Sequence, residues 1–331
     1  MTFIDRFLNE HHQELELGKY GLDAGWESVL LTPRFVTSRH VVALIFPAGA
    51  RQASLVVKVP RQPGDNDSVR HEARVLRELA AGPAAGVPEI VTLKDVGAHA
   101  VLVETAVTGD PLDPRRVASD LTRAVSAGTD FVDGMPCTRT AALNFDWYER
   151  TISGPLEALT ELVSQAPQTR ALVEHTHQKL EPLRRVQLPA VVEHGDLSHP
   201  NLFLRPQGSL QVVDWERART DGVPGHDLVF YFQYLSESRE HAFSRENQVA
   251  AFEKAFGPGG WANAPLASHL ESRGVEAGLL PLLVIATWAR SAATLSYRLD
   301  GKADGARAVG QLRAAVASDR DYWLWRHAVE G

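Results

Sequence analysis

The chain has 331 residues, of which 44% are hydrophobic and 23% charged, an ordinary composition for a globular protein of two lobes or domains. Its net charge of −7 repels phosphate backbones and disfavours nucleic acid as the main partner. The single cysteine, Cys137, excludes an internal disulfide and favours a reducing, cytoplasmic location.

The first hundred residues predict a β-rich segment with one prominent helix. A charged, polar helix is expected over the first 20 residues, which lack the apolar core of a signal peptide. Apolar residues at helical spacing, with a cap at Asp67 or Ser68, predict a helix from Asp67 to Ala80. The runs rich in Val, Leu and Ile that predict an antiparallel set of strands are Ser28–Leu31, Val41–Phe46, Leu55–Val59, Glu89–Leu93 and Val101–Glu104.

After Thr108-Gly109-Asp110-Pro111 the pattern changes and helical spacing dominates. The predicted helices are Pro114–Ala127, Trp147–Ser164, Pro167–Arg185, Asp227–Tyr234, Asn247–Phe256, Leu279–Arg298 and Ala306–Ala317. The apolar stretch Gly278 to Ala289 ends at Arg290 and is too short to span a membrane, so we expect a buried helix and no membrane association.

These patterns indicate an α+β protein with two lobes. We expect a β-rich N-terminal lobe over residues 1–106 and a helical C-terminal lobe over residues 107–331. The hinge should lie near Glu104 to Gly109, with a ligand cleft between the lobes, where small-molecule sites concentrate.

The most informative residues lie in a short β segment from Val191 to Trp215. A polar loop carries Asp196 and Asn201, and two apolar strands joined by Pro206-Gln207-Gly208 then lead to Asp214. Such a hairpin can bring Asn201 close to Asp214, and their oxygens suit Mg²⁺ accompanied by waters and substrate phosphates. Asp196 would stand on the same rim, placed to accept a proton from a hydroxyl group.

This segment resembles the catalytic segment of the aminoglycoside phosphotransferase and choline kinase family, relatives of the protein kinases. The residues that carry the resemblance are His194-Gly195-Asp196, Asn201 and Asp214-Trp215-Glu216. The resemblance implies a bilobal protein-kinase-like fold with Asp196 as the catalytic base. It also implies that Asn201 and Asp214 hold Mg²⁺ on the phosphates of ATP, with GTP as a second candidate.

Further residues gain roles from the same resemblance. Lys58, at the end of an apolar strand, would bind the phosphates and pair with Glu72 of the following helix. Main-chain atoms of Glu104 and Ala106 would receive adenine. The family's phosphate loop falls near Ser38 and Arg39, although no Gly-rich motif is present there. His194 is interpreted as a hydrogen-bonding residue of the loop and Asp227 as an N-cap that braces it.

The sequence leaves the acceptor open. The leading hypothesis is a phosphotransferase acting on a hydroxyl of a small molecule, such as an antibiotic, a sugar or an amino alcohol. One alternative is a kinase of Ser or Thr in a peptide precursor, and another is a non-catalytic nucleotide-binding protein of the same fold. Glu216, Asp221 and Glu237 are candidates for contacting a cationic acceptor, and the protein is expected to be a monomer or a homodimer.

Overall fold

The computed structural model describes residues 2–31, 40–162, 167–300 and 314–331. The chain divides into two compact units. The first consists of Met1–Asp110 and Phe203–Ala218, and the second of Pro111–Leu202 and Arg219–Gly331. The grouping differs from the proposed division at residue 106 because the hairpin Phe203–Ala218 belongs with the first unit. Two hydrogen bonds join this hairpin to the rest of the first unit. The Val212 N–H donates to the Gly86 carbonyl at 2.8 Å, and the Thr108 N–H donates to the Gln211 side chain at 2.7 Å.

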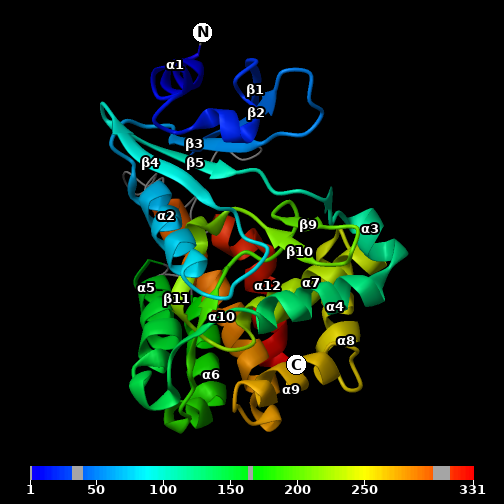
Figure 1. Ribbon diagram of the computed structural model, residues 1–331. Coiled ribbons are helices and arrows are strands. Elements are labelled where there is room, and N and C mark those ends of the chain that lie inside the picture. The colour runs from blue at the N-terminus through cyan, green and yellow to red at the C-terminus, as the bar shows by residue number, and fades with distance from the viewer. Residues whose placement is uncertain (1, 32–39, 163–166, 301–313) are drawn as a thin grey trace. The chain divides into compact units, whose positions relative to one another are not determined.

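A five-stranded antiparallel sheet forms the centre of the first unit (Figure 1), with the strand order β1-β2-β3-β5-β4. Its strands are β1 (Trp26–Leu31), β2 (His40–Pro47), β3 (Leu55–Pro60), β4 (Ile90–Val96) and β5 (His99–Thr105). All five lie within a few residues of the strands predicted from the apolar runs. The β-branched and leucine side chains of these runs fit a pleated surface that is packed on both faces.

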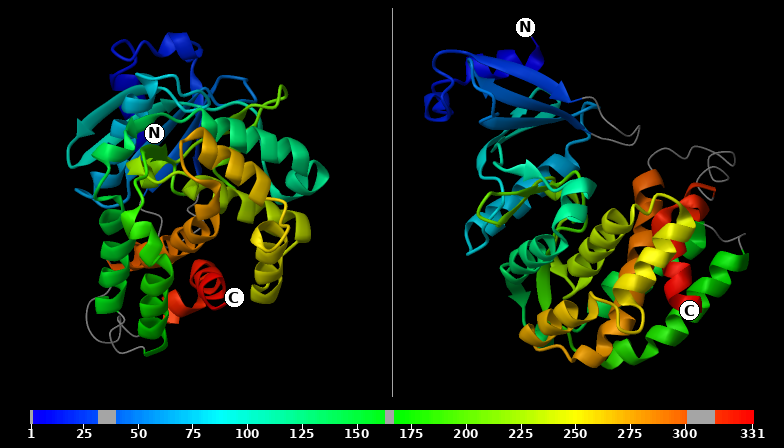
Figure 2. Two further views of the ribbon diagram at one scale, coloured as in Figure 1. Left: turned by 90° about the horizontal axis from the view of Figure 1, so that it is seen from below. Right: turned by 90° about the vertical axis from the view of Figure 1, so that its right-hand side faces the viewer.

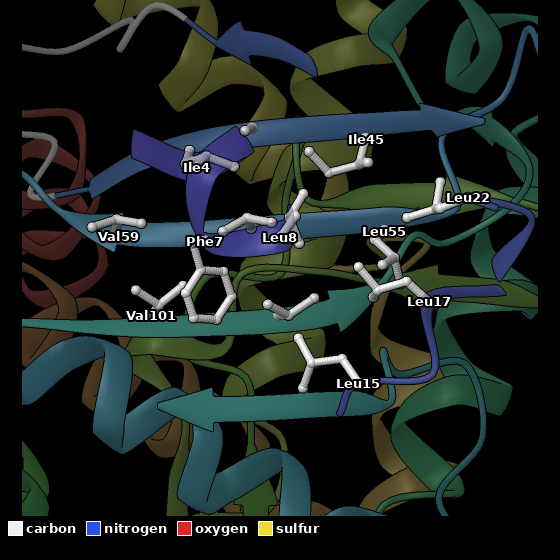
Figure 3. Packing of buried hydrophobic residues seen from close by; sticks show 13 residues of the cluster. Ile4, Phe7, Leu8, Leu15, Leu17, Leu22, Ile45, Leu55, Val59 and Val101 are labelled. Atoms are coloured by element: carbon white, nitrogen blue, oxygen red, sulfur yellow. The ribbon is translucent and has the colours of Figure 1, made fainter. Parts of the chain in front are cut away.

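Two helices cover opposite faces of this sheet (Figure 1). Helix α1 (Phe3–Glu10) packs Ile4, Phe7 and Leu8 onto the face that carries Ile45 and Val103 (Figure 3). Helix α2 (Asp67–Ala80) packs Val69 and Ala73 against Ala100 and Leu102 on the other face. The expected polar helix over 20 residues is therefore wrong in length and character, because α1 ends at Glu10 and is amphipathic.

Helix α2 begins and ends at the predicted residues, but its cap differs from the prediction. Its N-cap is Asn66, which makes no side-chain cap hydrogen bond. Instead, the Asn66 side chain accepts from Ala100 N–H at 2.7 Å and donates to the Ala98 carbonyl at 3.1 Å. This residue thus ties the start of α2 to the strand that lies beneath it.

The remaining strands form two small sheets. One has the order β10-β9-β6 and the other the order β11-β8-β7. Their strands are β6 (Asp110–Pro111), β7 (Cys137–Arg139), β8 (Ala190–Glu193), β9 (Leu202–Leu204), β10 (Leu210–Val212) and β11 (Arg219–Gly222).

The second unit is mainly helical (Figure 2). Its helices are α3 (Pro114–Ser119), α4 (Leu121–Asp133), α5 (Gly154–Leu162), α6 (Pro167–Leu180), α7 (His226–Glu240), α8 (Arg245–Phe256), α9 (Asn263–Ser272), α10 (Leu280–Asp300) and α12 (Arg320–Glu330). Short helical turns are η1 (Leu17–Tyr20) and η5 (Trp215–Arg217) in the first unit and η2 (Ala141–Leu143), η3 (Glu149–Ser153), η4 (Glu181–Arg185) and η6 (Ala277–Leu279) in the second.

Helix α10 forms the core of this unit, where it packs against α5, α7 and α12. Trp288, Ala289 and Ala292 are fully buried in it, as the apolar stretch predicts. Among the described helices, the stretch Ala277–Thr294 is long and apolar enough to cross a membrane, and 61% of it is buried inside the structure.

The predicted helices of this unit are confirmed with three differences. The stretch from Pro114 is two helices, because Asp120 ends α3 and caps α4 by accepting from Arg123 N–H at 3.0 Å. Helices α9 and α12 were not predicted. The helix expected over Ala306–Ala317 lies largely outside the described residues.

Candidate active site

The first unit contains a buried cluster of charges centred on Lys58. The Lys58 ammonium lies 2.5 Å from Glu72 Oε1, 3.2 Å from Glu104 Oε1 and 3.9 Å from Asp214 Oδ1. Lys58, Glu72 and Glu104 are almost fully buried, whereas the side chain of Asp214 is 41% exposed. The structure thus brings together four of the residues singled out from the sequence.

One ammonium among three carboxylates gives this cluster a net negative charge. Burial alone would lower the pKa of Lys58, but the charges of Glu104, Glu72 and Asp214 outweigh it and raise the pKa. Burial raises the pKa of the Glu104 carboxyl to about 7, with Lys58 opposing the shift. Lys58 therefore remains cationic, as a group that neutralises phosphate oxygens must be.

Glu72 joins Lys58 to the segment that carries Asp214. Its Oε1 atom accepts from Lys58 and also from the Trp215 N–H at 2.9 Å. Asp214 adopts a left-handed conformation with φ 70°, an uncommon one for a residue other than glycine. The turn is held by the packing of Trp215, which is fully buried and donates its indole N–H to the Val212 carbonyl at 3.0 Å.

A buried histidine contacts this segment. The His40 Nδ1 atom, at the start of β2, lies 3.2 Å from Glu216 Oε2, and its Nε2 atom lies 2.8 Å from Ser68 Oγ. Burial, together with the charge of Asp214, raises the pKa of Glu216 to about 7. Glu216 is therefore engaged by His40, and sequence reasoning did not single out this histidine.

In the second unit, Asp227 braces the polar loop that follows β8. Its buried carboxylate accepts from the His194 N–H at 2.6 Å and from the Gly195 N–H at 2.9 Å. Burial raises the pKa of Asp227 to about 6, although both N–H donors lower it. Asp227 lies in the first turn of α7, not at its N-cap, which is Gly225. The predicted N-cap position is therefore wrong by two residues.

The same loop fixes the positions of Asp196 and Asn201. The Asp196 N–H donates to His194 Nδ1 at 3.2 Å, so this nitrogen of the buried His194 ring acts as an acceptor. The Asn201 amide nitrogen donates to the Asp196 carbonyl at 3.1 Å. The contact leaves the Asn201 amide oxygen as the atom that can bind a metal ion.

The predicted magnesium ligands Asn201 and Asp214 belong to different units, and their joint binding of a metal ion stays a prediction. Each side chain offers an oxygen donor of the kind that Mg²⁺ prefers. Across the described residues, no three His, Cys, Asp or Glu side chains form a group able to hold a metal. Phosphates and waters would supply the remaining ligands of the predicted site. Mg²⁺ is commonly bound in this way.

A buried ion pair anchors the strand that leads into the loop, and the sequence analysis did not identify it. Arg290 of α10 donates to both carboxylate oxygens of Glu193, with Nη1 at 3.0 Å from Oε1. Val223 N–H donates to the same oxygen at 2.5 Å. Burial opposes ionisation of Glu193, but Arg290 lowers its pKa to about 2. An arginine that interrupts an apolar helix signals such a buried partner.

The other predicted residues are placed as follows. Ser38 and Arg39 lie outside the described residues. The Ala106 N–H donates to the Ser54 carbonyl at 2.9 Å, so its carbonyl is the main-chain group left for a base. The peptide of Glu104 is paired in the sheet opposite Val56 and Ile90.

Two acids considered for a cationic acceptor are already paired with arginine. Asp221 Oδ2 lies 2.7 Å from Arg150 Nη1, and Asp221 Oδ1 lies 3.1 Å from Arg219 Nε. Glu237 Oε2 lies 3.3 Å from Arg320 Nη1. Recognition of a polycation by these two side chains would require breaking these pairs.

Comparison with known proteins gives one family match and several similar structures. The sequence model of the phosphotransferase enzyme family matches residues 40–265. No curated protein matches the sequence. Similar solved structures include the GDP complex of a mutant aminoglycoside 2'-phosphotransferase-IIIa, with 16% identity and a TM-score of 0.52 over 93% of this chain and 96% of that chain.

Two further structures are kinases of small alcohols. Choline kinase LicA from Streptococcus pneumoniae has 13% identity and a TM-score of 0.50 over 93% of this chain and 100% of that chain. Ethanolamine kinase from Plasmodium vivax has 11% identity and a TM-score of 0.53 over 88% of this chain and 81% of that chain. At these identities the similarity establishes the fold, and the predicted α+β, protein-kinase-like class is confirmed.

Proposed function

The chain belongs to the phosphotransferase enzyme family, and on that premise we propose that it transfers the γ-phosphoryl group of ATP to a hydroxyl group of a small molecule. One observation carries the proposal. The buried Lys58–Glu72 pair is joined through the Trp215 N–H to the segment that presents Asp214. The lysine proposed to bind phosphate, its glutamate partner and the aspartate proposed to bind the metal thus lie in one unit, which supports the proposal.

Each residue has a defined part in the proposed reaction. Lys58 neutralises charge on the phosphate oxygens, and Asp196 orients the acceptor hydroxyl and takes its proton. The acceptor oxygen forms a bond to the γ-phosphorus as the bond from that phosphorus to the β–γ bridging oxygen breaks, and ADP leaves. Asn201 and Asp214 would hold Mg²⁺, which when bound neutralises charge on the transferred phosphoryl group. Asp227 acts by fixing the backbone of the loop, and Glu193, at the end of β8, binds the backbone of Val223.

The acceptor is proposed from the chemistry of the similar proteins. Those described above are named for an aminoglycoside, choline and ethanolamine. These acceptors share an alcohol and a cationic nitrogen. Because Asp221 and Glu237 are paired with arginine, we favour an acceptor with at most one cationic group over a polycation. We also infer a cytoplasmic location from the single, exposed cysteine.

The test is transfer of label from γ-labelled ATP with Mg²⁺ to a panel of aminoglycosides, nucleosides, choline-like alcohols and Ser/Thr peptides. Loss of a proton acceptor should lower the turnover of Asp196→Asn by about 100- to 10,000-fold, while binding of ADP remains within a few-fold of the wild type. Asp146→Asn is the matched control, because Asp146 is an exposed acid of the second unit that pairs with Arg150. A product that Asp196→Asn forms at the wild-type rate, or a wild type that binds no nucleotide, would contradict the proposal.

A further inference from the structure

The register of the central sheet places two neighbouring rows of side chains on the face that carries Lys58. Residues paired across strands point to the same face, and so do residues two apart along a strand. The first row is Leu31, Val42, Lys58 and Leu102. The second row, two residues along each strand, is Val29, Leu44, Val56 and Glu104.

The second row is an apolar strip that ends on a carboxylate. Val29 is 47% exposed, and Leu44 and Val56 are half-buried. A flat, partly exposed apolar surface suits the face of a planar heterocycle. Two residues along a strand correspond to about 7 Å, so a base on this strip would have its phosphates near Lys58 in the neighbouring row.

Glu104 offers one acceptor at the end of this strip. Its side chain is 1% exposed. The Oε1 atom is bound to the Lys58 ammonium at 3.2 Å, whereas the buried Oε2 atom has no hydrogen-bond partner within the described parts of the chain. A buried acceptor without a donor is costly, and a ligand that supplies the donor recovers that cost.

We propose that Glu104 selects the nucleotide base, its unpartnered oxygen accepting a hydrogen bond from the exocyclic amino group of a 6-aminopurine. The carbonyl of a 6-oxopurine would meet the same oxygen with a like partial charge and is rejected. Guanine also carries an oxygen at position 6, so in the same orientation it too places a carbonyl against the Glu104 oxygen. In this orientation adenine is the base that supplies a donor to that oxygen.

The inference rests on the proposed function, because it concerns the base of the nucleotide that the site would bind. Its test compares affinities for different bases and requires no acceptor. Dissociation constants are measured by calorimetry at pH 8, where Glu104, with a pKa of about 7, is ionised. The probes are ADP, GDP, inosine diphosphate and purine riboside diphosphate, which carries hydrogen at position 6.

In the wild type, ADP should bind about 10- to 100-fold more tightly than inosine diphosphate or purine riboside diphosphate, the range of a hydrogen bond to a charged group. In Glu104→Met this ratio should fall below about 3-fold, and in Glu104→Gln it should be intermediate. A variant that binds every diphosphate more weakly by the same factor has lost only the contact between Glu104 and Lys58. The test of base selection is therefore the ratio of the dissociation constants, not their absolute values. Asp95→Asn, an exposed acid of β4 paired with Arg70, should keep the wild-type ratio.

The outcomes separate the two proposals. A wild type that binds ADP, inosine diphosphate and GDP equally, or one that prefers GDP, overturns the role of Glu104 and leaves the proposed function standing. A ratio that survives in Glu104→Met also overturns it. A wild type that binds none of the four nucleotides overturns both proposals. If neither variant folds, the wild type alone still provides a test. Its affinity for ADP exceeds its affinity for purine riboside diphosphate only if an acceptor binds the amino group.

Discussion

At the scale of single residues, the Glu193–Arg290 pair makes the stability of the protein depend on pH. Glu193 has a pKa of about 2 in the folded chain and an ordinary value of 4.5. Its ionised form therefore stabilises the fold at all pH values above about 4.5. That contribution, about 3 kcal/mol from the difference in pKa, is lost as the pH falls from about 4.5 towards 2.

Arg290→Met should reverse this dependence. Without the guanidinium, burial raises the pKa of Glu193, and its ionised form destabilises the fold at neutral pH. We expect the variant to lose about 3 to 5 kcal/mol at pH 7, the typical result of breaking a buried pair. The deficit relative to the wild type should shrink as the pH falls towards 4. Urea unfolding at pH 8, 7, 6, 5 and 4 measures both effects.

The matched control is Arg326→Met. Arg326 pairs with Glu330 one turn further along α12, and both side chains are exposed. Exposed pairs of this kind contribute little to stability, so the control should follow the wild type at every pH. A deficit in Arg290→Met that stays constant from pH 8 to pH 4 would show that lost packing, not the buried charge of Glu193, is its cause.

The resemblance to the family predicted that Lys58 pairs with Glu72, and the structure brings the two side chains into contact. The resemblance gave no hint that the Glu104 side chain also contacts Lys58. That contact depends on the register of β5 against β3, which pairs Glu104 with Val56. Register is set by packing between residues distant in sequence. Arg290 was visible as an interruption of an apolar run, but its partner lies 97 positions earlier in the chain.

At the scale of elements, the close approach of α4 and α7 depends on a glycine. A Cβ atom on Gly128, in the middle of α4, would lie 2.0 Å from the ring of Tyr231. Tyr231 is fully buried and donates its hydroxyl to the Ala124 carbonyl at 2.7 Å. The glycine costs helix α4 roughly 0.5 to 1 kcal/mol relative to alanine, and the packing of Tyr231 explains its presence.

Gly128→Ala should therefore destabilise the protein, although alanine favours a helix. Displacing the Tyr231 ring costs about 1 to 3 kcal/mol, as overpacking usually does. Differential scanning calorimetry measures the loss. Gly278→Ala is the control, because a Cβ atom there would meet nothing within 4 Å. A Gly128→Ala protein as stable as the wild type would show that the ring can move without cost.

Elements were predicted well where apolar periodicity is clear, as in α2, whose bounds match although its cap does not. Prediction failed where tertiary packing decides the boundary. Helix α1 ends at Glu10, and the chain beyond it packs Leu15 and Leu17 into the same cluster on the sheet without continuing the helix. Helix α12 is rich in aromatic residues that are weak helix formers, and it is stabilised by the burial of Leu324 and Trp325.

At the scale of the whole molecule, the hairpin Phe203–Ala218 contributes to the first unit although it lies nearly 100 residues beyond the rest of that unit in the sequence. Gly109 permits part of this association. It has φ 124°, and a Cβ atom there would lie 2.8 Å from the Leu204 carbonyl oxygen. The consequence is that Asp214 and Lys58 belong to one compact body, whereas Asp196 and Asn201 belong to the other.

Amide hydrogen exchange with and without ADP tests whether the nucleotide binds to the first unit. A ligand at 100 times its dissociation constant stabilises the state that binds it by about 2.7 kcal/mol. Because the proposed contacts of ADP include the two rows of the central sheet and Lys58, exchange should slow in β1, β2, β3 and β5. It should also slow at the Trp215 amide, which is bonded to Glu72. Amides of α8, which belongs to the second unit, should exchange at an unchanged rate.

Inorganic pyrophosphate separates the base from the phosphates in the same experiment. It carries the charges that Lys58 would bind but has no base to cover the strip formed by Val29, Leu44 and Val56. We therefore expect pyrophosphate to slow exchange near Lys58 and Trp215 and to leave β1 unprotected, whereas ADP protects β1 as well. Protection of β1 by pyrophosphate alone would contradict the placement of the base on this strip. Protection by ADP confined to α4 and α7 would contradict the placement of the nucleotide in the first unit, because neither helix belongs to it.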